Sequence, residues 1–235
     1  MVFTRCYDPG MDRFIVKGIA ANVVAGAVFL ACMLIPAGTV RYWQAWAFFI
    51  AFETAGQGLG VYFLLHDRKV IERRVAIGPT AEKEPAQKVI STLFLLGFLV
   101  LLIFPALDHR YGWSPVPAYV SILGDGLVVL SLLANIPVLN ANRYAASTIR
   151  VEEGQTVVSS GPYALVRHPM YSAAIVLLVS IPLALGSWLG LLWLVPFSPV
   201  LAWRLLDEER FLRQELPGYA EYTQKVRYRL VPCVW

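Results

Sequence analysis

The residues best suited to do chemistry form two short polar clusters, one at each end of a long apolar block. The first cluster is the segment 161–171, and the second begins at Arg204 and includes Glu208. A helix would place Arg204 and Glu208 on one face, because they are four residues apart. Such a carboxylate can accept hydrogen bonds from ribose hydroxyls or pair with an ammonium group, and the arginine can orient an anionic group bidentately. The alternative is an exposed ion pair, which would stabilise a helix by about 0.3–0.5 kcal/mol.

The first cluster combines a helix start with charged and aromatic side chains. Pro169 predicts the first residue of a helix, because proline fits the first helical turn and disfavours helical torsions at His168 before it. The free N–H groups of that turn and the positive end of the helix dipole would suit a carboxylate or phosphate. Arg167 and His168 can add charge or hydrogen bonds, and Tyr163 and Tyr171 offer aromatic faces with polar tips. The alternative is an anchor at a membrane interface, where Arg and Tyr are common.

The composition places both clusters in a membrane protein. The 235 residues are 57% hydrophobic and 15% charged, with a mean hydropathy of +0.59, whereas soluble domains have about 25% charged residues. A span needs roughly 20 mostly apolar residues. We therefore expect an all-α polytopic membrane bundle. Its four spans are predicted at residues 14–37, 43–65, 89–107 and 117–139.

The next apolar block, residues 170–203, is too long for one ordinary span and is interrupted at Gly186-Ser187. It predicts a helical hairpin. The charged, amphipathic segment after Trp203 predicts a cytoplasmic cap that lies against the membrane surface. We interpret residues 1–235 as a single integral membrane domain. In it, residues 14–139 form the four-span scaffold and residues 140–235 form the cofactor-binding, catalytic part.

The distribution of Lys and Arg predicts the orientation, because positively charged loops remain in the cytoplasm. With the N-terminus inside, all of the 20 basic residues except Arg41 and Arg110 fall on the cytoplasmic side, provided that the hairpin enters and leaves there. We therefore expect both termini and the site to be cytoplasmic. This bias, with attraction to anionic lipids, explains the net charge of +4 better than nucleic acid does. The chain has no basic face with interleaved aromatics, so we expect no nucleic-acid partner.

The scaffold contains few groups with chemical potential. Glu53 is a carboxylate inside the second span and predicts either a structural hydrogen bond or a place in the lining of a substrate cavity. Gly56 and Gly60 have the spacing of close helix–helix contacts. The loop 108–113 is predicted on the outer face, with a capping or anchoring role. The three histidines and three cysteines show no metal-binding spacing, so we predict no metal site.

Three motifs in the second half have a family resemblance. They are QTVVSSGPY at residues 155–163, VRHPMY at residues 166–171, and Arg204 with Glu208-Glu209, followed by Leu212, Tyr219 and Tyr222. In this combination, residues 140–233 resemble the isoprenylcysteine carboxyl methyltransferase family and its phospholipid methyltransferase relatives. The preceding spans match only in general character.

The resemblance implies a helical membrane enzyme that binds S-adenosylmethionine on the cytoplasmic side and methylates a lipophilic acceptor. That acceptor would be isoprenylcysteine carboxylate-like or phospholipid-like, and membrane lipids would surround it. The resemblance also implies that Arg204 lies beside the acceptor as the catalytic residue. The implied cofactor contacts are Thr148, Gln155, Thr156, Val157, Val158, Tyr163, His168, Pro169, Met170, Tyr171 and Glu208.

Two departures from the family pattern leave the acceptor open. Leu216-Pro217-Gly218 replaces the more usual aromatic–glycine sequence, and no feature of the chain identifies a prenylated peptide as its acceptor. Two other functions fit the same sequence features. One is an NADPH-dependent reductase similar to the membrane sterol reductases, and the other is a non-catalytic membrane scaffold.

Overall fold

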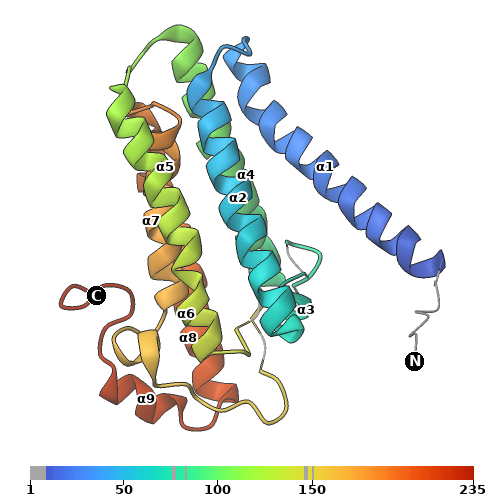
Figure 1. The fold of residues 1–235 in the computed structure, drawn as a ribbon. Helices are drawn as coiled ribbons and strands as arrows, with labels where there is room; N and C mark the ends of the chain where they lie inside the picture. Colours follow the sequence, from blue (N-terminus) through green and yellow to red (C-terminus); the bar gives the residue numbers. More distant parts are fainter. Residues whose placement is uncertain (1–8, 76–77, 83, 146–147, 150) are drawn as a thin grey trace.

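The computed structural model describes residues 9–75, 78–82, 84–145, 148–149 and 151–235. Within these ranges the chain is helical and has no β-strand, which confirms the all-α prediction. Figure 1 shows one bundle of long helices with short helices gathered at its lower end. In chain order the helices are α1 (Pro9–Ala37), α2 (Trp43–His66), α3 (Arg68–Val75), α4 (Pro85–Tyr111), α5 (Ala118–Leu133), α6 (Asn135–Ala141), η1 (Gly161–Ala164), α7 (Pro169–Ala184), η2 (Leu189–Trp193), α8 (Leu194–Glu215) and α9 (Tyr219–Lys225).

Among the described residues, four helical segments are long and apolar enough to cross a membrane, so the polytopic prediction is confirmed. They are Trp43–His66, Pro85–Tyr111, Ala118–Ala141 and Leu189–Glu215. The first three of these coincide with the second, third and fourth predicted spans. The fourth lies in the region predicted as a hairpin. Helix α7 is apolar but shorter, with 16 residues, because the chain turns at Gly186, whose φ of +76° suits glycine.

Glycines allow the helices that carry the site to pack closely. Helix α5 packs against α7, and a Cβ added at Gly124 of α5 would lie 2.5 Å from the backbone nitrogen of Ala184 in α7. A Cβ added at Gly97 of α4 would lie 2.3 Å from the ring of Phe197 in α8. These contacts exclude any larger side chain, so the glycines set how near the scaffold lies to α7 and α8.

At the upper end of the bundle, Asp108 connects the loop after α4 with the loop after α7. Its carboxylate accepts hydrogen bonds from the backbone N–H of Ser114 at 2.7 Å and from the hydroxyls of Ser114 and Ser187. Its neighbour His109 stacks on Tyr42 with ring centroids 4.0 Å apart. The prediction of a loop at residues 108–113 is wrong in its first part, because residues 108–111 form the last turn of α4, whereas Asp108 has the predicted capping role.

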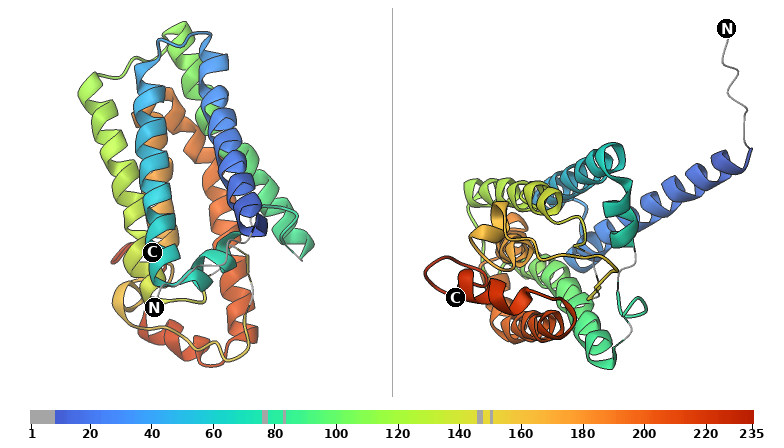
Figure 2. Two further views of the ribbon diagram at one scale, coloured as in Figure 1. Left: turned by 45° about the vertical axis from the view of Figure 1, so that its right-hand side comes forward. Right: turned by 90° about the horizontal axis from the view of Figure 1, so that it is seen from below.

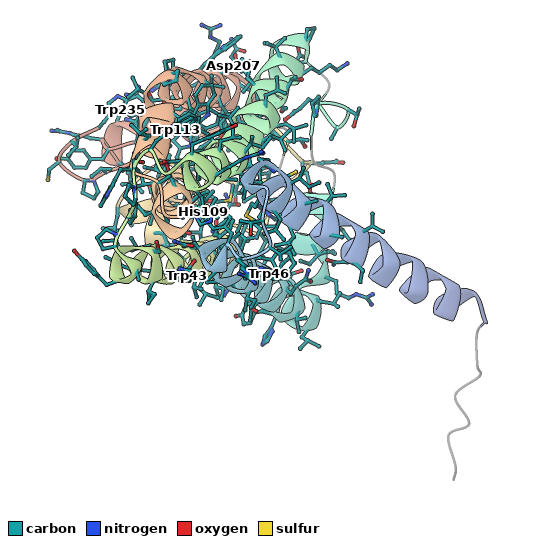
Figure 3. The ribbon with its side chains drawn as sticks, turned by 90° about the horizontal axis from the view of Figure 1, so that it is seen from above. Trp43, Trp46, His109, Trp113, Asp207 and Trp235 are labelled. Atoms are coloured by element: carbon teal, nitrogen blue, oxygen red, sulfur yellow. The ribbon has the colours of Figure 1, made fainter. Side chains whose placement is uncertain are left out.

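Aromatic side chains ring the same end of the bundle. Trp43 and Trp46 begin α2, and Trp113 follows α4 (Figure 3). All three are exposed, as expected of an aromatic belt at a membrane interface. The upper end of the bundle therefore fits one interfacial region of a bilayer.

The polar residues inside α2 form hydrogen bonds within α2 and to helix α1. Gln57 donates hydrogen bonds to Asn22 of α1 at 2.8 Å and to Glu53 at 3.2 Å. Glu53 therefore has a structural hydrogen bond, which is one of the two roles predicted for it. The predicted close contact at Gly56 and Gly60 is wrong, because a Cβ added at either would meet no described atom within 4 Å. Helix α1 diverges from this part of α2 toward its own N-terminus (Figure 1).

Candidate cofactor site

A pocket lies at the lower end of the bundle, where α7 begins and α8 ends. The view from below shows α3, η1 and α9 around this end (Figure 2). All of the cofactor contacts that the resemblance implies line this one pocket, from Thr148 to Glu208. Their role toward a cofactor stays a prediction, but the fold brings them together. The other lining residues are Asn142, Tyr144, Ala145, Ile149, Arg167, Leu212, Leu216, Tyr219 and Tyr222.

The inner wall of the pocket joins the two polar clusters directly. Helix α7 begins at Pro169, and His168 before it has a non-helical φ of −126°. This start directs Tyr171, in the first turn, toward α8. The Tyr171 hydroxyl donates a 2.6 Å hydrogen bond to Glu208 Oε2. A carboxylate and an aromatic ring therefore meet at the back of the pocket.

The neighbouring carboxylate, Glu209, is fully occupied by side chains of the protein itself. Its Oε1 lies 3.0 Å from Arg167 Nη1 and 3.3 Å from His168 Nε2, and its Oε2 lies 3.1 Å from Arg229 Nε. The side chain of Glu209 is only 5% exposed. A buried carboxylate needs such partners because its charge is costly to remove from water. Glu208 is thus the member of the acidic pair that faces the pocket.

Arg167 is structural, whereas its sequence pattern also predicted a contribution of charge to a ligand. Its Nε donates to the Val226 carbonyl at 2.7 Å and its Nη2 donates to the Thr223 carbonyl at 2.8 Å. The backbone N–H groups of Arg167 and His168 donate to the carbonyls of Tyr228 and Arg229. The segment before α7 therefore fixes the C-terminal segment in place, and Arg167 uses its donors in that contact.

Tyrosines from η1 and α9 form another wall. Tyr222 Oη donates a 2.7 Å hydrogen bond to the carbonyl of Tyr163. Burial raises the pKa of the Tyr163 phenol to about 12, so it remains protonated at neutral pH. The Tyr219 hydroxyl is buried and has no hydrogen-bond partner among the residues that the structure describes. An unsatisfied buried hydroxyl in a pocket lining suits a polar ligand, because such groups are rarely left without a partner.

Helix α3 supports the chain before η1, part of which lines the pocket. The sequence did not predict this support. Arg73 holds Glu152 with N–O distances of 2.7–3.0 Å and lies over the ring of Tyr144 at 4.9 Å. Arg74 Nη1 lies 3.2 Å from the sulfur of Met170. In the sequence these arginines indicated only the orientation in the membrane. Their partners are about 70 to 100 residues away, and no local signal pairs them.

Arg204 lies outside the pocket lining, behind Tyr171. Its side chain is buried, and Nη1 lies 2.8 Å from Glu82 Oε1. The same guanidinium donates to Gln87 of α4, whose amide donates to Asp207. The loop before α4 thus supplies a carboxylate that neutralises Arg204, a contact that sequence reasoning did not predict.

Comparison with known proteins finds similarity in the part of the chain that carries both polar clusters. Residues 119–217 match the family model described as phospholipid methyltransferase. The match covers less than half of the chain, and over that part the chain is similar to this family of membrane methyltransferases. The matched stretch runs from α5 through α8 and includes both polar clusters, whereas Glu82 and α3 precede it and α9 follows it.

The matches to individual relatives cover between 37% and 53% of this chain. A probable protein-S-isoprenylcysteine O-methyltransferase of Oryza sativa subsp. japonica is 32% identical over 133 residues, or 53% of this chain and 64% of that protein. The cobalt-zinc-cadmium resistance protein CzcN of Cupriavidus metallidurans is 29% identical over 136 residues, or 50% and 61%. A Delta(14)-sterol reductase of Mus musculus is 30% identical over 91 residues, or 37% and 22%. The chain thus spans less than two thirds of each of these proteins.

Proposed function

We propose that this chain is a membrane methyltransferase of the phospholipid methyltransferase family, which binds S-adenosylmethionine in the pocket between α7 and α8 and methylates a lipophilic acceptor. The meeting of Tyr171 and Glu208, 2.6 Å apart at the back of a pocket that contains every implied cofactor contact, is the main support. When bound, S-adenosylmethionine supplies an electrophilic methyl group.

The residues of the pocket suit this cofactor. Glu208 can accept hydrogen bonds from ribose hydroxyls or pair with the amino-acid ammonium group. The buried hydroxyl of Tyr219 offers a hydrogen bond that no described residue satisfies. The faces of Tyr163 and Tyr171 can pack against an adenine ring or lie beside a positively charged sulfonium. The pocket therefore has groups for each part of the molecule.

The protein would contribute mainly by alignment, because methyl transfer needs no covalent nucleophile from the enzyme. Acceptor and methyl must lie roughly 3–3.5 Å apart and in line, and such positioning can lower a barrier by several kcal/mol. The loop at residues 151–158 and helix α9 line the pocket and would exclude water, which otherwise stabilises the charged ground state.

We propose that the acceptor approaches from the membrane, on the side of Tyr171 where Arg204 lies. An acceptor carboxylate or phosphate would have to exchange with Glu82 before it could bind Arg204 bidentately. An uncharged acceptor would leave that ion pair in place.

The proposed active site also includes Glu82 and α3 of the scaffold, so the catalytic part extends beyond residues 140–235. We further propose that this end of the bundle and both termini are cytoplasmic, as the Lys and Arg distribution predicts.

The similarity to a sterol reductase makes an NADPH-dependent reductase the second candidate. A 2′-phosphate needs a basic pocket. Arg167 is the one Lys or Arg among the described lining residues, and its guanidinium is already bonded to Glu209 and two carbonyls. The pocket therefore favours S-adenosylmethionine. Titration of the purified protein with NADPH and with S-adenosylmethionine compares the two candidates directly.

Calorimetric titration with S-adenosylmethionine tests the proposed site. Glu208→Gln keeps the shape of the side chain but removes its charge, so we expect roughly ten- to a hundredfold weaker binding, as for a lost charged hydrogen bond. The matched control is Glu215→Gln at the exposed end of the same helix, which should bind as the wild type does. Equal affinity in the wild type and Glu208→Gln would refute the assignment of Glu208.

A further inference from the structure

A surface groove lies beside the end of α8, separate from the cofactor pocket. The two share no lining residue. Glu209 separates them, since its Oε1 contacts Arg167 and His168 beside the pocket while its Oε2 contacts Arg229 in the groove. The groove is lined by Leu206, Glu209, Arg210, Arg213, Gln214 and Arg229.

The groove carries an excess of positive charge. Three of its lining side chains are arginines, and Glu209 is the one acidic residue in the lining that the structure describes. The charge of Glu209 is already balanced by Arg167 and Arg229. Arg210 and Arg213 are exposed, and neither forms a hydrogen bond or ion pair within the part of the chain that the structure describes. Two guanidinium groups are therefore available to an anion from outside.

The groove also lies where α8 changes from apolar to cationic. Trp203, Leu206, Arg210 and Arg213 are spaced by three, four and three residues, so they share one face of the helix. Trp203 and Leu206 are 44% and 47% exposed. In a membrane-spanning helix, a change from exposed apolar residues to arginines within one turn marks the boundary between hydrocarbon and headgroups.

The C-terminal segment adds interfacial groups to the same groove. The Arg229 guanidinium lies over the ring of Trp235 at 5.3 Å, and Trp235 is 40% exposed. Figure 3 shows Trp235 at the edge of the molecule. Tryptophan is enriched at the level of lipid headgroups, because its ring is apolar and its N–H is polar. The lining of the groove thus combines three arginines with Leu206, and Trp235 lies beside it against Arg229.

We propose that this groove binds one anionic phospholipid. Arg210 and Arg213 would hold the phosphate, with Arg229 beside it still bound to Glu209, and the acyl chains would lie along Leu206 and Trp203. Arginine suits this role because its planar fork binds phosphate oxygens bidentately. A free phosphate would leave Leu206 and Trp203 without a partner, whereas a lipid has a phosphate for the arginines and acyl chains for these two side chains. This site lies outside the proposed active site, so the inference stands apart from methyl transfer.

Lipid titration of the purified, delipidated protein in a neutral detergent tests this proposal. Native mass spectrometry would count bound dioleoyl phosphatidylglycerol and dioleoyl phosphatidylcholine, which share acyl chains but differ in net charge. We expect tighter binding of the phosphatidylglycerol. The double variant Arg210→Gln/Arg213→Gln should bind it roughly thirtyfold more weakly, since each basic residue near a lipid surface contributes about a fivefold gain in affinity.

Two control variants separate a defined site from a general attraction to positive charge. Arg227→Gln removes an exposed arginine that does not line the groove, and it should bind phosphatidylglycerol as the wild type does. Arg210→Lys/Arg213→Lys keeps the charge and should keep most of the preference. Equal binding of the two lipids, or wild-type binding by the double glutamine variant, would overturn the proposal. Displacement of the lipid by millimolar inorganic phosphate would instead assign the groove to free phosphate.

Discussion

The contact between Arg167 and the C-terminal segment allows a quantitative prediction. In the variant Arg167→Ala, Glu209 loses its 3.0 Å partner, and the carbonyls of Thr223 and Val226 lose their donors. Removing one member of a buried ion pair costs about 3–5 kcal/mol. Glu209 would keep Arg229 at 3.1 Å and His168 at 3.3 Å, so the lower end of the range applies. We expect a loss of about 3 kcal/mol in the attachment of the C-terminal segment.

Hydrogen exchange of the backbone amides in residues 226–230 measures this loss. If these amides exchange by local opening of the segment, a change of about 3 kcal/mol speeds their exchange roughly 150-fold. The affinity for S-adenosylmethionine should fall too, because Tyr219 and Tyr222 line the pocket. Arg227→Ala, in the same segment but exposed, is the control and should exchange as the wild type does. Wild-type protection in Arg167→Ala would refute the reasoning.

Two further perturbations test the packing and the acceptor side. Gly124→Ala places a Cβ against the backbone of Ala184, which cannot rotate away, and should lower the stability by about 1–3 kcal/mol in detergent melts. Gly126→Ala meets no described atom and should not destabilise the protein, so equal melting temperatures would contradict the packing argument. Glu82→Gln removes the charge that neutralises Arg204 and should increase the inhibition of methyl transfer by a long-chain carboxylate several-fold relative to the matching amide. An unchanged ratio would show that Glu82 does not control access to Arg204.

Much of the fold follows from the sequence, because membrane helices are specified by local composition. The apolar stretches predicted three of the four long spans to within a few residues at their beginnings or ends. Pro169 predicted the start of α7, and Gly186 lies where the chain turns after it. These features depend on the solubility and torsions of short segments. They do not require knowledge of which helices become neighbours.

Contacts between distant segments could not be predicted in the same way. Arg167 and His168 are adjacent in one motif, and the motif alone does not show what Arg167 binds. Arg167 binds the C-terminal segment because the carbonyls of Thr223 and Val226 lie beside it. Glu82 meets Arg204 across more than 120 residues, and nothing near Glu82 indicates a partner. The prediction of a close helix contact at Gly56 was wrong for a related reason. Small-residue spacing gives such a contact only if a second helix lies near.

Transfer of a labelled methyl group tests the central claim most directly. Purified protein would be incubated with methyl-labelled S-adenosylmethionine and total membrane lipid, and the lipid-soluble products would be identified by mass. We predict label in a lipophilic product with the wild type, little with Glu208→Gln, and wild-type labelling with Glu215→Gln. Absence of labelled product with the wild type, together with reduction of a lipid when NADPH is supplied, would contradict the account.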